Sequence, residues 1–286
     1  MIGAYEITLV AVVSINLMLA LGLNLITGFC GQVSLGHAAF FGTGAYAAAL
    51  VAASGMPLVA VIAFAGLMAS LIGLLVGFTS LRVREDFLAI TTMGVGFVFV
   101  GFVRKQGWLG AEMGLTDIPD HGLGDLGFIG LCVLLVIAMA ALTAHIKNSW
   151  LGFGFAAVAE DEATAKTLGI DAARYKLVAF VIGTFLAGVA GAVYAYFTRF
   201  IIPGAFGFTI SISILSMVIV GGVGSIWGVV VASIVLTLLP EFSRVINDYK
   251  LLLYGGLIVL TMRFAPEGLA GLARRWRTRR KPAGEP

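Results

Sequence analysis

The chain is a succession of nine apolar stretches separated by short polar segments. Most of these stretches have the length of a membrane-spanning helix, which needs roughly 17–25 residues. Across the chain 60% of residues are apolar and 12% are charged, whereas about a quarter of the residues in soluble domains are charged. The stretches lack the alternation of apolar and polar residues that is typical of membrane β-barrels. We therefore predict an all-α integral membrane protein with about eight to ten transmembrane helices, some of them glycine-broken or re-entrant. The nine stretches are residues 7–27, 35–54, 58–80, 87–103, 127–146, 177–197, 201–220, 226–240 and 251–264.

The distribution of basic residues predicts the orientation of the chain, because Lys and Arg accumulate on the cytoplasmic side of membrane proteins. With the N-terminus outside and the C-terminus in the cytoplasm, 13 of the 18 basic residues lie in cytoplasmic segments and 5 in external ones. The start of the chain has no basic region, so we expect it to be the first span and not a signal peptide. We predict one transmembrane domain over residues 1–271 and a basic cytoplasmic tail over residues 272–286. The tail is expected to bind anionic lipid headgroups and not nucleic acid.

The nine stretches contain almost none of the residues that carry chemistry. Arg263 is the only full charge within them, whereas ion-coupled transporters place ionisable groups inside the bilayer. The sequence has no phosphate-binding G-x-x-x-x-G-K-[ST] loop and no catalytic constellation. Its two cysteines, Cys30 and Cys132, have no metal-ligand spacing. We therefore expect neither enzymatic activity, nor a cofactor, nor a metal site, and any uphill transport would need energy from a partner.

A polar, glycine-rich segment separates the first two stretches. Residues 24–37 include three glycines together with Asn24, Gln32, Ser34 and His37. Irregular backbone at membrane depth is tolerated where it lines a cavity, so these four side chains are candidates for a solute pathway. The alternative is an ordinary tight turn at the cytoplasmic face, with His37 hydrogen-bonded at the start of a helix.

The longest polar segment on the predicted cytoplasmic side covers residues 147–176. Glu160, Asp161 and Glu162 give the start signal of a short helix, and Gly169 gives its stop signal. Such a surface helix could dock a peripheral motor protein. The alternative is a helix lying on lipid, although its acidic polar face is unusual for that role. We predict that four residues form one apolar face: Phe155, Val158, Ala165 and Leu168.

Two further glycine patterns predict close packing. Small residues recur every fourth position along one helix face, as in membrane helices that pack tightly. These residues are Gly183, Ala187, Gly191 and Ala195. A second glycine cluster at residues 221–228 falls at another predicted cytoplasmic turn.

Taken together, these motifs resemble the LivM-type permease of the branched-chain amino acid ABC importer family. The matching segments occur in the order of the family and extend over nearly the whole chain. They are Gly31–Gly42 (GQVSLGHAAFFG), Gly114–Pro119 (GLTDIP), Glu160–Ile170 (EDEATAKTLGI), Tyr175–Val181 (YKLVAFV), Ala187–Ala192 (AGVAGA), Gly221–Ser225 (GGVGS) and Pro266–Leu269 (PEGL).

The resemblance implies a complex in the bacterial cytoplasmic (inner) membrane. A second, LivH-like permease would share the pore, and two LivG/LivF-like ATPase subunits would use ATP and Mg. An extracytoplasmic solute-binding protein would deliver the solute. By the same resemblance residues 147–176 form the coupling loop, with Glu160, Asp161, Glu162 and Gly169 at or near the ATPase contact.

The chain departs from the family pattern at two points in this loop. Family members often carry arginines where this chain has Phe153, Ala156 and Ala159. Glu162 lies seven residues before Gly169, whereas the general coupling motif of ABC importers has a spacing of six. Both departures bear on how the ATPase would dock.

Leucine, isoleucine and valine are the solutes that the resemblance implies. The runner-up is an ABC permease for urea or short-chain amides. Two other classes remain open from the residues themselves. One is a stand-alone facilitator channel for small polar solutes, and the other is a membrane scaffold without transport activity.

Overall fold

The computed structural model describes residues 3–80, 85–116, 118–242 and 249–271. Within these ranges the chain is helical, and the only β-pairing is a single bridge between Leu115 and Ile201. The all-α prediction is confirmed. Arg82, Arg84, Arg244 and the tail 272–286 lie outside the described ranges. The helices are α1 (Ala4–Leu23), α2 (His37–Ala52), α3 (Leu58–Ser80), α4 (Glu85–Lys105), α5 (Gly124–Lys147), α6 (Trp150–Glu160), α7 (Glu162–Thr167), α8 (Ala172–Thr198), α9 (Phe208–Gly221), α10 (Ile226–Leu238) and α12 (Lys250–Phe264).

Short non-α helical turns lie between or extend these helices. They are the π-helix η1 (Asn24–Phe29) and the 3₁₀ turns η2 (Gly107–Leu109), η3 (Pro203–Phe206) and η4 (Leu239–Phe242).

Each of the nine predicted spans contains a helix. Among the described residues, six helical segments are long and apolar enough to cross a bilayer. The other three predicted spans contain the shorter helices α2, α10 and α12. The six long segments are Tyr5–Phe29, Leu58–Thr79, Phe87–Lys105, Gly124–Lys147, Ala172–Thr198 and Pro203–Gly221.

Helix α8 occupies the centre of the bundle and packs on α1, α2 and α3. Its glycines face these neighbours: a Cβ at Gly191 would overlap the Phe41 carbonyl of α2, and one at Gly183 would overlap Ile26. Ala187 and Ala195 are fully buried on the same helix. The predicted small-residue stripe is therefore a packing face, because only residues without bulky side chains let the backbones approach this closely.

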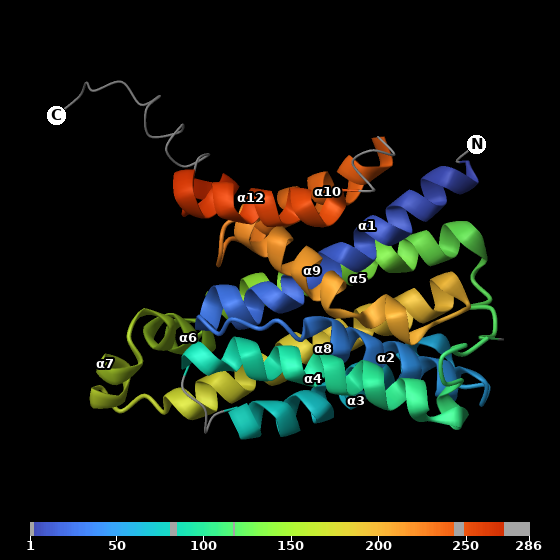
Figure 1. The fold of residues 1–286 in the computed structure, drawn as a ribbon, viewed down its shortest axis with the longest axis horizontal. Coiled ribbons are helices and arrows are strands. Elements are labelled where there is room, and N and C mark those ends of the chain that lie inside the picture. Colours follow the sequence, from blue (N-terminus) through green and yellow to red (C-terminus); the bar gives the residue numbers. More distant parts are fainter. Residues whose placement is uncertain (1–2, 81–84, 117, 243–248, 272–286) are drawn as a thin grey trace.

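The two ends of the bundle differ in structure (Figure 1). Helices α6 and α7 lie at one end, and the N-terminus of α1 lies at the other. At the first end the Lys147 ammonium donates a 2.7 Å hydrogen bond to the Gly224 carbonyl, which joins α5 to the turn between α9 and α10. Elsewhere, Arg199 pairs with Asp120 at 2.6 Å, beside the bridge between Leu115 and Ile201. These two groups of segments are those that the sequence assigns to opposite sides of the membrane.

Candidate functional site

The chain is broken between α1 and α2. Helix α1 continues as the π-helix η1, a form that is frequent at functional sites. Residues 31–36 then lack helical structure until α2 begins at His37. Gly31 has a φ of 72°, a backbone conformation that residues with a Cβ rarely adopt. We call residues 24–36 the broken segment.

Helix α2 begins inside the bundle and not at its surface. The N–H groups at a helix start have no partner within the helix, so other groups must accept their hydrogen bonds. The Ala38 N–H donates to the Ser211 hydroxyl of α9 at 3.1 Å, and the Leu35 N–H donates to the Thr92 hydroxyl of α4 at 3.0 Å. Thr92 and Ser211 were not among the candidates from the sequence, where each is one hydroxyl within an apolar helix.

Ser34 and His37 are fully buried in this interior position. Neither the Ser34 hydroxyl nor either His37 ring nitrogen has a hydrogen bond of normal geometry to a described residue, although the ring lies near the Leu19 carbonyl. His37 starts a helix, as the turn interpretation expected, but it lies within the bundle, and among the described residues only the Leu19 carbonyl lies near its ring. Buried polar groups without partners are costly, so these two side chains could serve a transient partner.

Asn24 and Gln32 have structural partners instead. The Asn24 side-chain carbonyl accepts a 2.9 Å hydrogen bond from the Gly224 N–H in the turn between α9 and α10. The Gln32 side-chain amide donates to the Lys176 backbone carbonyl near the start of α8, at 2.9 Å. Both side chains are buried. Among the four pathway candidates, Asn24 and Gln32 therefore hydrogen-bond other segments of the chain. Ser34 and His37 have no hydrogen bond of normal geometry to a described residue.

The segment 147–176 forms two helices, α6 and α7, joined at Asp161. The Asp161 carboxylate caps α7 by accepting from the Ala163 and Thr164 N–H groups at 2.8 and 3.1 Å. Gly169, with a φ of 81°, follows the end of α7. There the N–H groups of residues 169 and 170 return to carbonyls of the last turn. The predicted start signal is confirmed for Asp161 and Glu162 and the stop signal for Gly169, whereas Glu160 is the last residue of α6.

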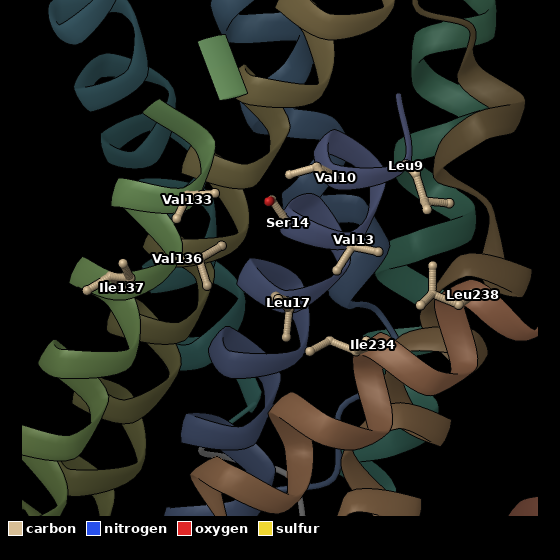
Figure 2. Close-up of a pocket in the computed structure, with 10 residues that line it drawn as sticks. All are labelled: Leu9, Val10, Val13, Ser14, Leu17, Val133, Val136, Ile137, Ile234 and Leu238. Carbon is tan, nitrogen blue, oxygen red and sulfur yellow. The ribbon is translucent and has the colours of Figure 1, made fainter. Parts of the chain in front are cut away.

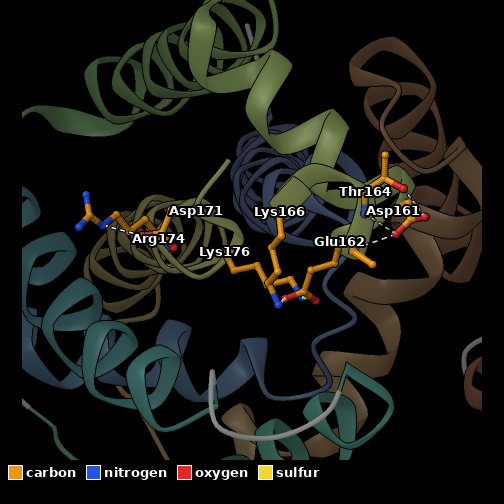
Figure 3. Close-up of polar contacts among 8 residues, drawn as sticks. Asp161, Glu162, Thr164, Lys166, Asp171, Arg174 and Lys176 are labelled. Carbon is orange, nitrogen blue, oxygen red and sulfur yellow. Dashed lines mark hydrogen bonds and ion pairs between the residues drawn. The ribbon is translucent and has the colours of Figure 1, made fainter. Parts of the chain in front are cut away.

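Glu162 bridges two lysines, as Figure 3 shows. Its carboxylate lies 2.9 Å from the Lys166 ammonium and 2.5 Å from the Lys176 ammonium. Lys166 is exposed, whereas Lys176 is only 8% exposed. The partly buried pair between Glu162 and Lys176 therefore joins α7 to α8.

The predicted apolar face of this segment packs inward. Phe155, Val158 and Ala165 are buried in a cluster that includes residues of η1 and the start of α8. The prediction is wrong for Leu168, which is 73% exposed. Leu168 is the last residue before Gly169, and the reversal of the chain there turns its side chain away from the bundle. Glu160 is also exposed, so the outer surface combines acidic and apolar groups.

A separate apolar cavity of about 320 Å³ lies between α1, α5 and α10 (Figure 2). Ser14 supplies the only hydroxyl in its lining, and none of the four pathway candidates lines it. The cavity therefore offers space for aliphatic groups but no partner for a carboxylate or an ammonium. Its lining residues are Leu9, Val10, Val13, Ser14, Leu17, Val133, Val136, Ile137, Ile234 and Leu238.

Comparison with known proteins decides the family. Residues 6–262 match the family described as the permease component of the branched-chain amino acid transport system. The chain belongs to this permease family. It is therefore a multi-pass, non-catalytic membrane subunit of the ABC transporter class.

The permease resembles several characterised relatives. It is 32% identical to the high-affinity branched-chain amino acid permease LivM of Escherichia coli, over 96% of this chain and 72% of the relative. Identity to BraD of Pseudomonas aeruginosa is 26%, over 89% of this chain and 91% of the relative. Identity to LivH of Escherichia coli is 32%, over 49% of this chain and 46% of the relative. No solved structure gives a significant match.

The permease exposes the three positions at which family members often carry arginine. Phe153 is 68% exposed, and Ala156 and Ala159 are exposed as well. Two of these side chains point away from the buried cluster, but Ala159 also contacts the broken segment, because a Cβ at Gly31 would lie 3.2 Å from its Cα. The outer face of α6 is therefore free of basic residues at these positions.

Proposed function

We propose that this permease carries leucine, isoleucine and valine across the bacterial cytoplasmic membrane as one of two homologous pore subunits of an ATP-driven importer. The family membership over residues 6–262 carries this proposal. The N-terminus lies outside, and α6 and α7 face the cytoplasm, in accord with the excess of basic residues in the predicted inner segments.

The exposed surface of α6 and α7 is the proposed docking site for two partner ATPases. It presents Glu160 and Leu168 beside the capped turn at Gly169. A short helix held on the membrane domain by a buried apolar face suits this role, because force applied to it reaches the bundle directly. The similarity of one half of the chain to LivH supports a second, homologous permease as the other pore subunit.

The proposed solute pathway passes the broken segment at the start of α2. Ser34 and His37 offer polar atoms that no described residue uses, and the N-terminus of α2 favours negative charge. Arg263 is the only full charge within the nine predicted spans, so few charges there would hold a zwitterion tightly, which suits a path that must release its solute. Both side chains are fully buried here, so the pathway is closed at this point in this conformation.

Affinity purification tests the assembly. A tagged copy is purified from membranes of the cells that naturally produce the permease, and the bound proteins are identified by mass spectrometry. We expect a second permease and two ATPase subunits. A chain that purifies alone, and that conducts solute downhill in liposomes without ATP, is instead a facilitator.

Competition tests the solute. Liposomes that contain the whole importer and its binding protein are assayed for ATP-dependent uptake of labelled leucine. Excess isoleucine or valine should abolish this uptake, whereas urea or acetamide should not. The reverse pattern would assign the importer to urea or short-chain amides.

A further inference from the structure

The segment 147–176 is fastened to the broken segment at three points along its length. At its start, the Lys147 ammonium lies 5.5 Å from the centroid of the Phe29 ring. In its middle, Ala159 lies against Gly31. At its end, the Lys176 backbone carbonyl accepts the hydrogen bond from Gln32. The broken segment is therefore in contact with α6 itself and with the two helices, α5 and α8, that flank α6 and α7 in the chain.

The third contact, between Lys176 and Gln32, differs from the other two because Lys176 also contacts α7. Glu162, the first residue of α7, holds the Lys176 ammonium, and the Lys176 backbone holds Gln32. The Gln32 backbone carbonyl in turn accepts a 2.9 Å hydrogen bond from the Thr27 hydroxyl of η1. Two links of this chain are buried side chains, Lys176 and Gln32. Water therefore competes weakly for the hydrogen bond between Gln32 and Lys176, whereas the Glu162 side chain remains 26% exposed.

We propose that Glu162, Lys176 and Gln32 form a strut that transmits movement of α7 to the broken segment, and so links ATP hydrolysis to opening of the pathway. Glu162 is then a positioning residue that acts through Lys176. The family resemblance instead implied that Glu162 lies at or near the contact with the ATPase. This inference rests on the proposed function. Ser34 and His37 lie two and five residues beyond Gln32, so a shift of Gln32 is passed directly to them.

The ion pair between Glu162 and Lys176 allows the strut to be tested by a double variant. Breaking a partly buried ion pair by removing one charge is destabilising, whereas a neutral pair of similar shape is tolerated. Glu162→Gln removes the carboxylate charge that holds the Lys176 ammonium, so it should loosen the strut. Adding Lys176→Gln makes both members neutral and allows an amide pair to form. The double variant should therefore recover much of the function that the single variant loses.

The test measures solute taken up per ATP hydrolysed, in liposomes that contain the whole importer and its solute-binding protein. We expect Glu162→Gln to lower this ratio roughly threefold or more, which is the scale of mutational effects on coupling between sites. Gln32→Leu should lower it as well, by breaking only the last link and without stranding a charge. The double variant Glu162→Gln with Lys176→Gln should regain part of the loss.

Arg174→Gln is the matched control. It also breaks an ion pair at the start of α8, with Asp171 at 2.8 Å, but both side chains are exposed. Its ratio of uptake to hydrolysis should equal that of the wild type. The strut is overturned if Gln32→Leu keeps the wild-type ratio, or if Glu162→Gln releases the ATPases while Lys176→Gln retains them. A wild-type importer that purifies without ATPases overturns the proposed function, and this inference with it.

Discussion

Gly31 combines two demands that no other residue type meets. Its φ of 72° is left-handed, and a Cβ there would lie 3.2 Å from the Ala159 backbone. The left-handed conformation costs residues with a Cβ about 1–2 kcal/mol. Gly31→Ala should therefore lower the free energy of unfolding of the permease by about that amount. It should also disturb the contact between Gly31 and Ala159 of α6. The midpoint of thermal unfolding of the detergent-solubilised chain measures the effect.

Gly130→Ala is the control for this substitution. Gly130 lies within α5 and a Cβ there meets nothing within 4 Å. Alanine is a better helix former than glycine, so the midpoint should stay or rise slightly. Equal losses of stability for the two variants would contradict the account of Gly31.

Asp161 stabilises α7 more strongly in its charged form than in its protonated form. Hydrogen bonds from the Thr164 N–H, the Thr164 hydroxyl and the Ala163 N–H lower the pKa of this carboxyl. Because the folded pKa lies below the unfolded one, the stabilisation is complete above the unfolded pKa. It is lost as the pH falls through the folded value. Asp161→Ala should raise hydrogen exchange of α7 amides several-fold at neutral pH.

Asp161→Asn separates the cap from the charge. Asparagine caps helices about as well as aspartate, so this variant should keep the protection of α7 at neutral pH. In this variant the protection of the α7 amides, corrected for intrinsic exchange, should no longer decrease at acidic pH, because asparagine does not titrate. An unprotected α7 in the asparagine variant would show that the charge, and not the cap geometry, holds the helix.

At the residue scale, local signals were predictable and long-range partners were not. Asp161 and Gly169 act within a few positions of themselves, so their types already indicate the ends of α7. Gln32 bonds a carbonyl 144 positions away, and Glu162 reaches Lys176 across a reversal of the chain. No local pattern specifies such partners, because they depend on how the helices pack.

Among the elements, α8 carries the tightest constraint. At Gly191 a Cβ would overlap the Phe41 carbonyl, so Gly191→Leu should force α2 and α8 apart. Overpacking of this kind typically costs about 1–3 kcal/mol. The expected result is a lower midpoint of thermal unfolding and less folded protein in detergent. Gly101→Leu on α4, where nothing lies within 4 Å, should have little effect on the isolated chain.

The helices themselves were largely predictable, because long apolar runs have few other solutions in a bilayer. The depth at which α2 begins was not. Its 16 residues extend about 24 Å, less than the roughly 30 Å of a bilayer core. The glycines of the broken segment predicted an interruption of the helix. Only the hydrogen bonds to Thr92 and Ser211 show that this interruption lies inside the bundle. These partners lie on α4 and α9, far along the chain.

At the scale of the whole molecule, the contacts to the broken segment come from three helices around the α6–α7 end. Lys147 is the last residue of α5, Ala159 lies on α6, and Lys176 lies near the start of α8. The contacts on which the proposed coupling depends therefore lie at this end, which the proposed function places in the cytoplasm.

That orientation makes a prediction that cysteine labelling can decide. The two native cysteines, Cys30 and Cys132, are 1% and 0% exposed, so they give a low background. Ala163 on α7 and Met113 between α4 and α5 are both exposed. In intact cells a membrane-impermeant maleimide should label Met113→Cys and spare Ala163→Cys, whereas inside-out vesicles should show the reverse. Labelling of Ala163→Cys from outside would show that the permease has the opposite orientation. The α6–α7 surface would then lie outside the cell, where cytoplasmic ATPases cannot bind it.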